Sequence, residues 1–68
     1  MEKKYYKNYQ YYAFHQKITD VTKIIINAFV DARSGYVHIA EINMPGKLTE
    51  AEIDFLAMDK IHEIGVLA

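Results

Sequence analysis

The sequence predicts an α+β fold in which a three-stranded antiparallel β-meander is followed by one C-terminal helix, in the order β-β-β-α. Three observations carry this prediction: a capped amphipathic segment over residues 49–64, a glycine-ended turn between two β-branched runs, and a tyrosine-rich segment ahead of them. A sheet with one helix on one face is a stable two-layer arrangement. We expect residues 1–68 to form a single small domain, since the chain has 68 residues.

The clearest element is a helix over residues 49–64. Thr49 and Glu52 form a capping box, in which the hydroxyl caps the Glu52 amide and the carboxylate reaches back to the Thr49 amide. Leu48 and Ile53 stand at the positions of a hydrophobic staple, and Gly65 supplies a left-handed stop. The helical spacing predicts one apolar face made of Ile53, Leu56, Ala57, Ile61 and Ile64.

A β-hairpin precedes the helix. Residues 31–35, Asp-Ala-Arg-Ser-Gly, are typical of a hairpin loop with glycine at the left-handed position. Pairing Asp31 with Tyr36 predicts further cross-strand neighbours, which stabilise sheets when they are β-branched or aromatic. On one face these are Val30 with Val37, Ala28 with Ile39 and Ile26 with Glu41; on the other, Phe29 with His38 and Ile25 with Ile42.

A helix over residues 20–34 is the alternative. Asp20 would be its N-cap and Gly35 its stop, and its apolar spacing would be made by Val21, Ile24, Ile25, Ala28, Phe29 and Ala32. Three consecutive isoleucines and the turn favour strands, because β-branched residues fit a pleated surface.

The tyrosine-rich segment predicts the first strand, over residues 9–18, which turns at residues 19–23 into the hairpin. One helix covers one face of such a sheet, and we expect that face to hold Ile24, Ile26, Ala28, Val30, Val37 and Ile39. The opposite face would expose Ile25, Phe29, Tyr36, His38 and Ile42, with tyrosines of the first strand. This exceeds the apolar area that monomers normally expose. The alternative is that the N-terminus or residues 66–68 fold over one surface.

Composition and chain pattern exclude several classes of protein. The absence of cysteine excludes disulfides, thiolate metal sites and thiol catalysis. The longest apolar run, residues 24–30, is too short to span a membrane, and the N-terminus lacks the apolar stretch of a signal peptide. We therefore expect a cytoplasmic protein with no membrane association, in the host cell's cytoplasm if a phage encodes it.

Catalytic and metal-site patterns are weak. The single serine, Ser34, sits in the expected turn, and His15, His38 and His62 are scattered without the spacing of a metal site, even with Glu41 as a fourth ligand. The carboxylates Glu50, Glu52 and Asp54 fit the positive end of a helix. We expect no catalytic residues, no metal and no cofactor.

A single-stranded nucleic-acid binder is one functional hypothesis. Tyrosines on a strand stack bases when lysines stand close by, and Lys3, Lys4 and Lys7 would contact phosphates. Residues 1–23 hold five lysines against two acidic groups, whereas residues 24–68 hold three basic groups against seven acidic ones. The acidic second part opposes a polyanion, which makes this the weaker hypothesis.

A protein-binding module explains more of the sequence. Tyrosine buries a large area at low entropic cost and keeps a polar group, and methionine and aromatic residues are enriched in interfaces. We expect two partner-binding surfaces, one with Tyr9, Tyr11 and Tyr12 and one with Phe55, Met58 and His62. By analogy of size and fold alone, such a chain would be a stoichiometric inhibitor of a host enzyme or nucleic-acid-binding complex, of the phage or mobile-element type, and a homodimer. A structural subunit of a larger assembly is a third hypothesis.

Overall fold

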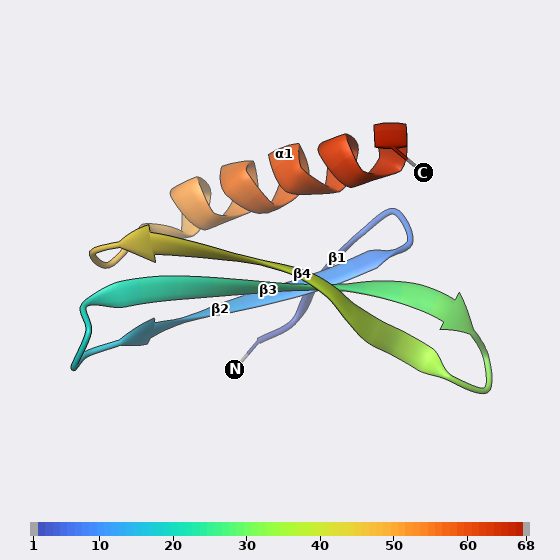
Figure 1. Ribbon diagram of the computed structural model, residues 1–68, viewed down its shortest axis with the longest axis horizontal. Helices are drawn as coiled ribbons and strands as arrows, with labels where there is room; N and C mark the ends of the chain where they lie inside the picture. The colour runs from blue at the N-terminus through green and yellow to red at the C-terminus, as the bar shows by residue number, and fades with distance from the viewer. Residues whose placement is uncertain (1, 68) are drawn as a thin grey trace.

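The computed structural model describes the backbone of residues 2–67 and the side chains of residues 2–65. One helix lies along one face of a four-stranded antiparallel sheet with the strand order β1-β2-β3-β4, so the sheet has one covered face and one open face (Figure 1). The elements in chain order are β1 (Lys4–Tyr6), β2 (Tyr9–Gln16), β3 (Val21–Asp31), β4 (Gly35–Pro45) and α1 (Glu50–Leu67). The predicted α+β class is confirmed, but the sheet has four strands instead of three.

The additional strand is β1, which pairs with β2 through Lys4 opposite Tyr11 and Tyr6 opposite Tyr9. The two strands are joined by Lys7 and Asn8, and Lys7 adopts a left-handed φ of 56°. A lysine there is unusual, since left-handed backbone normally selects glycine, asparagine or aspartate. The sequence therefore lacks the usual signal for this turn, and a strand of three residues is too short for its alternation to be recognised.

The hairpin formed by β3 and β4 is confirmed, and the alternative helix over residues 20–34 is wrong. Asp31 Oδ1 accepts hydrogen bonds from the backbone N–H of Arg33 at 2.9 Å and of Ser34 at 2.7 Å, which closes the loop. Gly35 follows with a φ of 70°. The preceding turn covers residues 17–20, slightly earlier than predicted, so β2 ends at Gln16.

The predicted register of this hairpin is wrong. Asp31 lies opposite Gly35 instead of Tyr36, and two bulges then shift the pairing. Val30 is the extra residue on β3 and Ile39 the extra residue on β4. Each bulge reverses which residues share a face, because side chains alternate along a strand. Ile42 therefore lies opposite Ile24 and packs against the core, although the sequence placed it on the open face.

Helix α1 begins as predicted. The Thr49 N–H donates to Glu52 Oε1 at 2.8 Å and the Glu52 N–H donates to Thr49 Oγ1 at 3.2 Å, which is the reciprocal capping box. The predicted stop at Gly65 is wrong, since the helix continues to Leu67. Within the described part of the chain, no helix is both long enough and apolar enough to cross a membrane.

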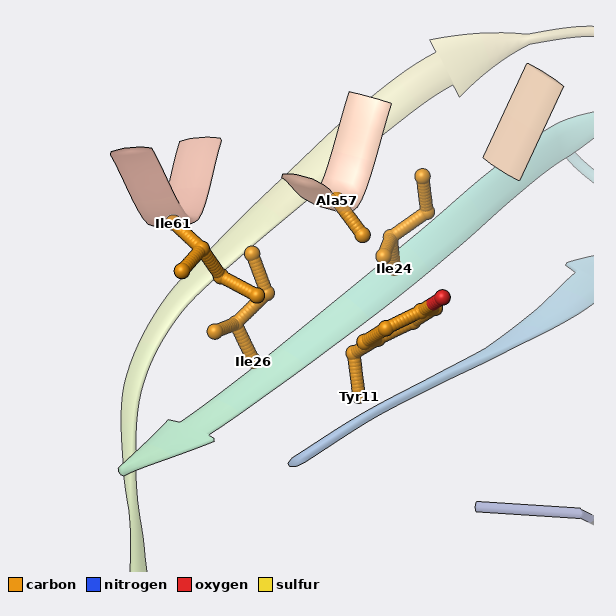
Figure 2. Packing of buried hydrophobic residues seen from close by; sticks show 5 residues of the cluster. All are labelled: Tyr11, Ile24, Ile26, Ala57 and Ile61. Atoms are coloured by element: carbon orange, nitrogen blue, oxygen red, sulfur yellow. The ribbon is translucent and has the colours of Figure 1, made fainter. Parts of the chain in front are cut away.

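The core lies between α1 and the two central strands, where the side chains of Tyr11, Ile24, Ile26, Ala57 and Ile61 point toward one another (Figure 2). The covered face is shorter than predicted. The loop end of the β3–β4 hairpin extends away from α1 (Figure 1). Consequently Val30, Val37 and Ile39, expected under the helix, are 53%, 40% and 41% exposed.

Candidate functional site

The three tyrosines predicted to form one surface are divided between the two faces of the sheet, because they occupy alternating positions of β2. Tyr9 and Tyr11 point to α1, where Tyr9 packs against the core and Tyr11 is 3% exposed. Tyr12 lies on the open face and is half-buried. The assignment of Tyr11 to a partner-binding surface is therefore wrong: its ring is needed by the core.

Tyr11 belongs to a polar anchor that joins β1 and β2 to the first turns of α1. Its hydroxyl donates to Asp54 Oδ1 at 2.9 Å, and Lys4 Nζ donates to the same carboxylate at 2.9 Å while also pairing with Glu50 at 2.6 Å. Hydrogen bonds from Lys4, and then from Tyr11, hold the pKa of Asp54 below its ordinary value. Burial, followed by the bond to Asp54, raises the pKa of Tyr11 to about 12.

The second predicted surface lies on α1, away from the open face. Phe55 is 70% exposed and Met58 is 36% exposed. His62 is exposed, and its Nε2 lies 2.8 Å from the hydroxyl of Tyr6, which joins α1 to β1. Tyr12 and Phe55 stand on opposite layers, so most of the two predicted sets lie apart. Tyr9 and His62 are the exception, since they line one pocket with Lys7, Ile61 and Gly65.

The lysines proposed for phosphate contacts are also separated. Lys4 lies in the anchor, where its bonds to Glu50 and then Asp54 raise its pKa. Lys3 stands over the ring of Tyr12 at 5.9 Å from its centroid, whereas Lys7 stands over the ring of Tyr6 at 5.6 Å, on the face of α1. Of the three, Lys3 is the one next to the open face.

The open face carries an aromatic cluster, which we define as Tyr5, Phe29 and Tyr36. These rings come from β1, β3 and β4 and are 62%, 45% and 36% exposed. The centroids of Tyr5 and Tyr36 are 5.8 Å apart and those of Phe29 and Tyr36 are 5.4 Å apart, the latter pair edge to face. This separation and tilt are favourable for aromatic pairs, so the three rings form one continuous surface.

Two amide side chains hold the aromatic cluster in place. Gln10 lies between Tyr5 and Asn27 in the register of the sheet and is 6% exposed. Asn27 Nδ2 donates to Gln10 Oε1 at 3.0 Å, and Gln10 Nε2 donates to the Tyr5 hydroxyl at 3.1 Å. A buried amide with satisfied bonds has few alternative positions, which fixes the Tyr5 ring above the sheet.

Charge is separated between the two layers of the molecule. Residues 2–49, which form the sheet and its loops, contain seven basic and four acidic residues, whereas residues 50–67 contain one basic and five acidic. The sheet layer is therefore net positive by three and the helix layer net negative by four, with histidines neutral. On the open face, Lys23 Nζ pairs with Glu41 Oε2 at 3.5 Å.

The three histidines lie in separate parts of the structure. His15 contacts Asp20 at 2.8 Å, His38 lies 3.8 Å from Glu41, and His62 contacts Tyr6. Among residues 2–67, no three histidine, aspartate or glutamate side chains come together as a metal site would require.

Sequence reasoning missed two residues that make the open face. Tyr5 was outside every predicted strand, because β1 was not expected, and Gln10 was not expected to be buried. A signal for both exists in the sequence: residues 5, 10 and 27 share a face once a two-residue turn at residues 7–8 is assumed.

No family model, curated protein or solved structure matches this chain.

Proposed function

We propose that this protein is a non-enzymatic protein-binding module that docks through the open face of its sheet. The observation that carries the proposal is the aromatic cluster: three exposed rings, with Tyr36 packed against both Tyr5 and Phe29, on a sheet face that α1 does not cover. Contiguous exposed apolar patches of this kind mark interaction sites on small proteins. The side chains that we expect to dominate binding are Tyr5, Phe29 and Tyr36.

A protein partner fits the chemistry of this face. Rigid aromatic rings bury large areas at low entropic cost, and tyrosine hydroxyls at their edge hydrogen-bond to a partner's backbone. A small domain that docks through one flat face acts by covering the surface it binds. This is the basis for proposing a stoichiometric inhibitor, of the phage or mobile-element type, and a structural subunit of an assembly would use the same face.

A single-stranded nucleic acid is the second candidate, because the charge separation favours it. The open face belongs to the positive layer and lies away from the carboxylates of α1. Lys3 and Lys23 stand beside its aromatic side chains, as in sheets that stack bases. The Lys23–Glu41 pair and the edge-to-face packing of the rings weigh against it, since both reduce the surface available to phosphates and bases.

The test uses a variant of the cluster and a matched variant of the other layer. Phe29→Ala with Tyr36→Ala removes two rings from the open face, and Phe55→Ala removes a more exposed ring from α1. The immobilised wild-type and variant proteins are incubated with nuclease-treated lysate of the source cells. We expect a protein retained by the wild type and by Phe55→Ala, with affinity for the double variant reduced about 30-fold or more, as at hot spots.

Titration with labelled single-stranded oligonucleotides at several salt concentrations separates the two candidates. Binding that falls steeply with salt and is lost in the double variant would establish the nucleic-acid function instead, since phosphate contacts release counterions. With circular dichroism showing both proteins folded, equal protein capture by the wild type and the double variant would contradict the protein candidate, and equal oligonucleotide binding by both would contradict the nucleic-acid candidate.

A further inference from the structure

The two edges of the sheet differ in how they are protected against another strand. β1 has three residues, and its Lys4 is held in the anchor to α1. β4 has eleven residues, Gly35–Pro45, and contains neither lysine nor arginine. Natural sheets protect their edges with short strands, charges, prolines and bulges, so β1 is protected in the usual way. In the eleven residues of β4 these devices are limited to the bulge at Ile39, Glu41 and the terminal Pro45.

The bulge at Ile39 gives β4 an unusual pattern of side chains. Register with β3 places Tyr36, His38, Glu41 and Asn43 on the open face, and Val37, Ala40, Ile42 and Met44 on the covered face. The bulge lies between the two halves of each set. As a result, a two-fold axis between residues 39 and 40 maps the open-face set onto itself and pairs Val37 with Ile42 on the covered face, which alternation would forbid in a regular strand.

When two β4 strands pair in an antiparallel manner about this axis, side chains of compatible chemistry lie opposite each other on both faces of the sheet. His38 lies opposite the partner's Glu41, so one carboxylate and one imidazole meet at each of two symmetric positions. On the covered face Val37 lies opposite the partner's Ile42. Next to the axis the bulge residue Ile39 lies opposite the partner's Ala40, and at the end of the pairing Gly35 lies opposite its Met44. Val37 and Ile39, which are 40% and 41% exposed in the monomer, would each gain an apolar neighbour.

From this complementarity we infer that β4 is the dimer interface of the protein, and that its partner is the β4 strand of a second copy. The interface is isologous and closes at two subunits. The two sheets join into one of eight strands, with both helices on one side. Both open faces then lie on the other side, so the dimer presents two aromatic clusters in the same direction. The inference does not depend on the proposed function, which concerns the open face.

The first test is the mass in solution, by light scattering on a size-exclusion column over a range of concentrations. We expect twice the chain mass of 7.9 kDa at high concentration. Val37→Lys places a charge in the proposed interface and should shift the protein to monomer. Val30→Lys is the matched control, since Val30 is 53% exposed on β3, outside the interface, and should leave the dimer intact.

A charge exchange tests the register itself. His38→Glu puts two carboxylates opposite each other twice per dimer and should raise the dissociation constant of the dimer about tenfold. Combining it with Glu41→His restores opposite groups and should recover the wild-type dissociation constant. A monomeric wild type at millimolar concentration would overturn the inference. The inference would also be overturned if Val37→Lys left the dimer unaffected. It would likewise be overturned if Glu41→His failed to restore the dimerisation lost in His38→Glu.

Discussion

At the scale of single residues, Tyr11 combines two roles that usually belong to different side chains. Its ring packs with Ile24 and Ile26 in the core, and its hydroxyl ends beside Asp54 at the start of α1. The same carboxylate receives Lys4 from β1. One aspartate therefore joins the edge strand, the adjacent strand and the helix, and the small core depends on this polar contact for its alignment.

Replacing Tyr11 with phenylalanine tests the anchor. The variant keeps the ring and removes the donor to Asp54, so we expect the free energy of unfolding to fall by about 1–2 kcal/mol, near the lower end for a bond to a charged group because Lys4 remains. Tyr12→Phe, on the open face, should leave the free energy of unfolding unchanged within about 0.5 kcal/mol. Urea denaturation followed by circular dichroism measures both. Equal stability of the two variants would contradict the anchor.

The stability difference between the wild type and Tyr11→Phe should depend on pH. The pKa of Tyr11 is raised by folding to about 12 from 10.0, so its contribution to stability is present below pH 10 and is lost as the pH rises toward 12. Asp54 acts in the opposite direction: its pKa is lowered by folding, so its contribution is lost as the pH falls through the acidic range. The stability difference between wild type and Tyr11→Phe should therefore shrink above pH 10. A difference constant from pH 8 to 12 would contradict the role of the hydroxyl.

At the scale of elements, replacing either of two glycines with alanine should change the free energy of unfolding, in opposite directions for the two positions. Gly35 has a φ of 70° at the start of β4, where an alanine would be strained, so Gly35→Ala should cost about 1 kcal/mol of unfolding free energy. Gly65 lies inside α1 with open space around its Cα, so Gly65→Ala should add about 0.5–1 kcal/mol. Thermal denaturation distinguishes the two signs. Destabilisation by Gly65→Ala would mean that the helix ends at residue 65.

Elements with a local chemical signal were predictable from the sequence. The capping box at Thr49 and Glu52 fixed the helix start, and Asp31 with Gly35 fixed the hairpin loop. Elements without such a signal were not predictable from the sequence. β1 depends on a turn at Lys7, a residue that rarely adopts its backbone conformation. The bulges at Val30 and Ile39 arise from pairing between strands and leave no mark within either strand.

At the scale of the whole molecule, the sequence predicted the aromatic character of the candidate site better than it predicted which residues form the site. The apolar excess indicated a binding face, and Phe29, Tyr36 and Tyr12 lie on it as expected. Tyr9 and Tyr11 do not lie on this face. Side chains alternate along β2, so these two point to α1 and pack in or against the core. Tyr5 joined the site through β1. One missed strand and one missed bulge therefore changed the composition of the face without changing its aromatic character.

We propose that the layered arrangement gives each surface a separate role: the open face to bind a partner, the β4 edge to bind a second copy, and the acidic helix to cover the core from the other side. Val37 lies on the covered face and outside the aromatic cluster, so Val37→Lys should not abolish binding through the open face. Val37→Lys would then reduce avidity for an immobilised partner while preserving the affinity of a single site.

The most direct test of the central claim is site-specific photo-crosslinking in lysate of the source cells. A photoreactive phenylalanine analogue replaces Tyr36 on the open face in one sample and Phe55 on α1 in another. We expect a discrete protein adduct from position 36, resistant to nuclease and sensitive to protease, and none from position 55. Adducts to nucleic acid at position 36, or a protein adduct from position 55 alone, would contradict it.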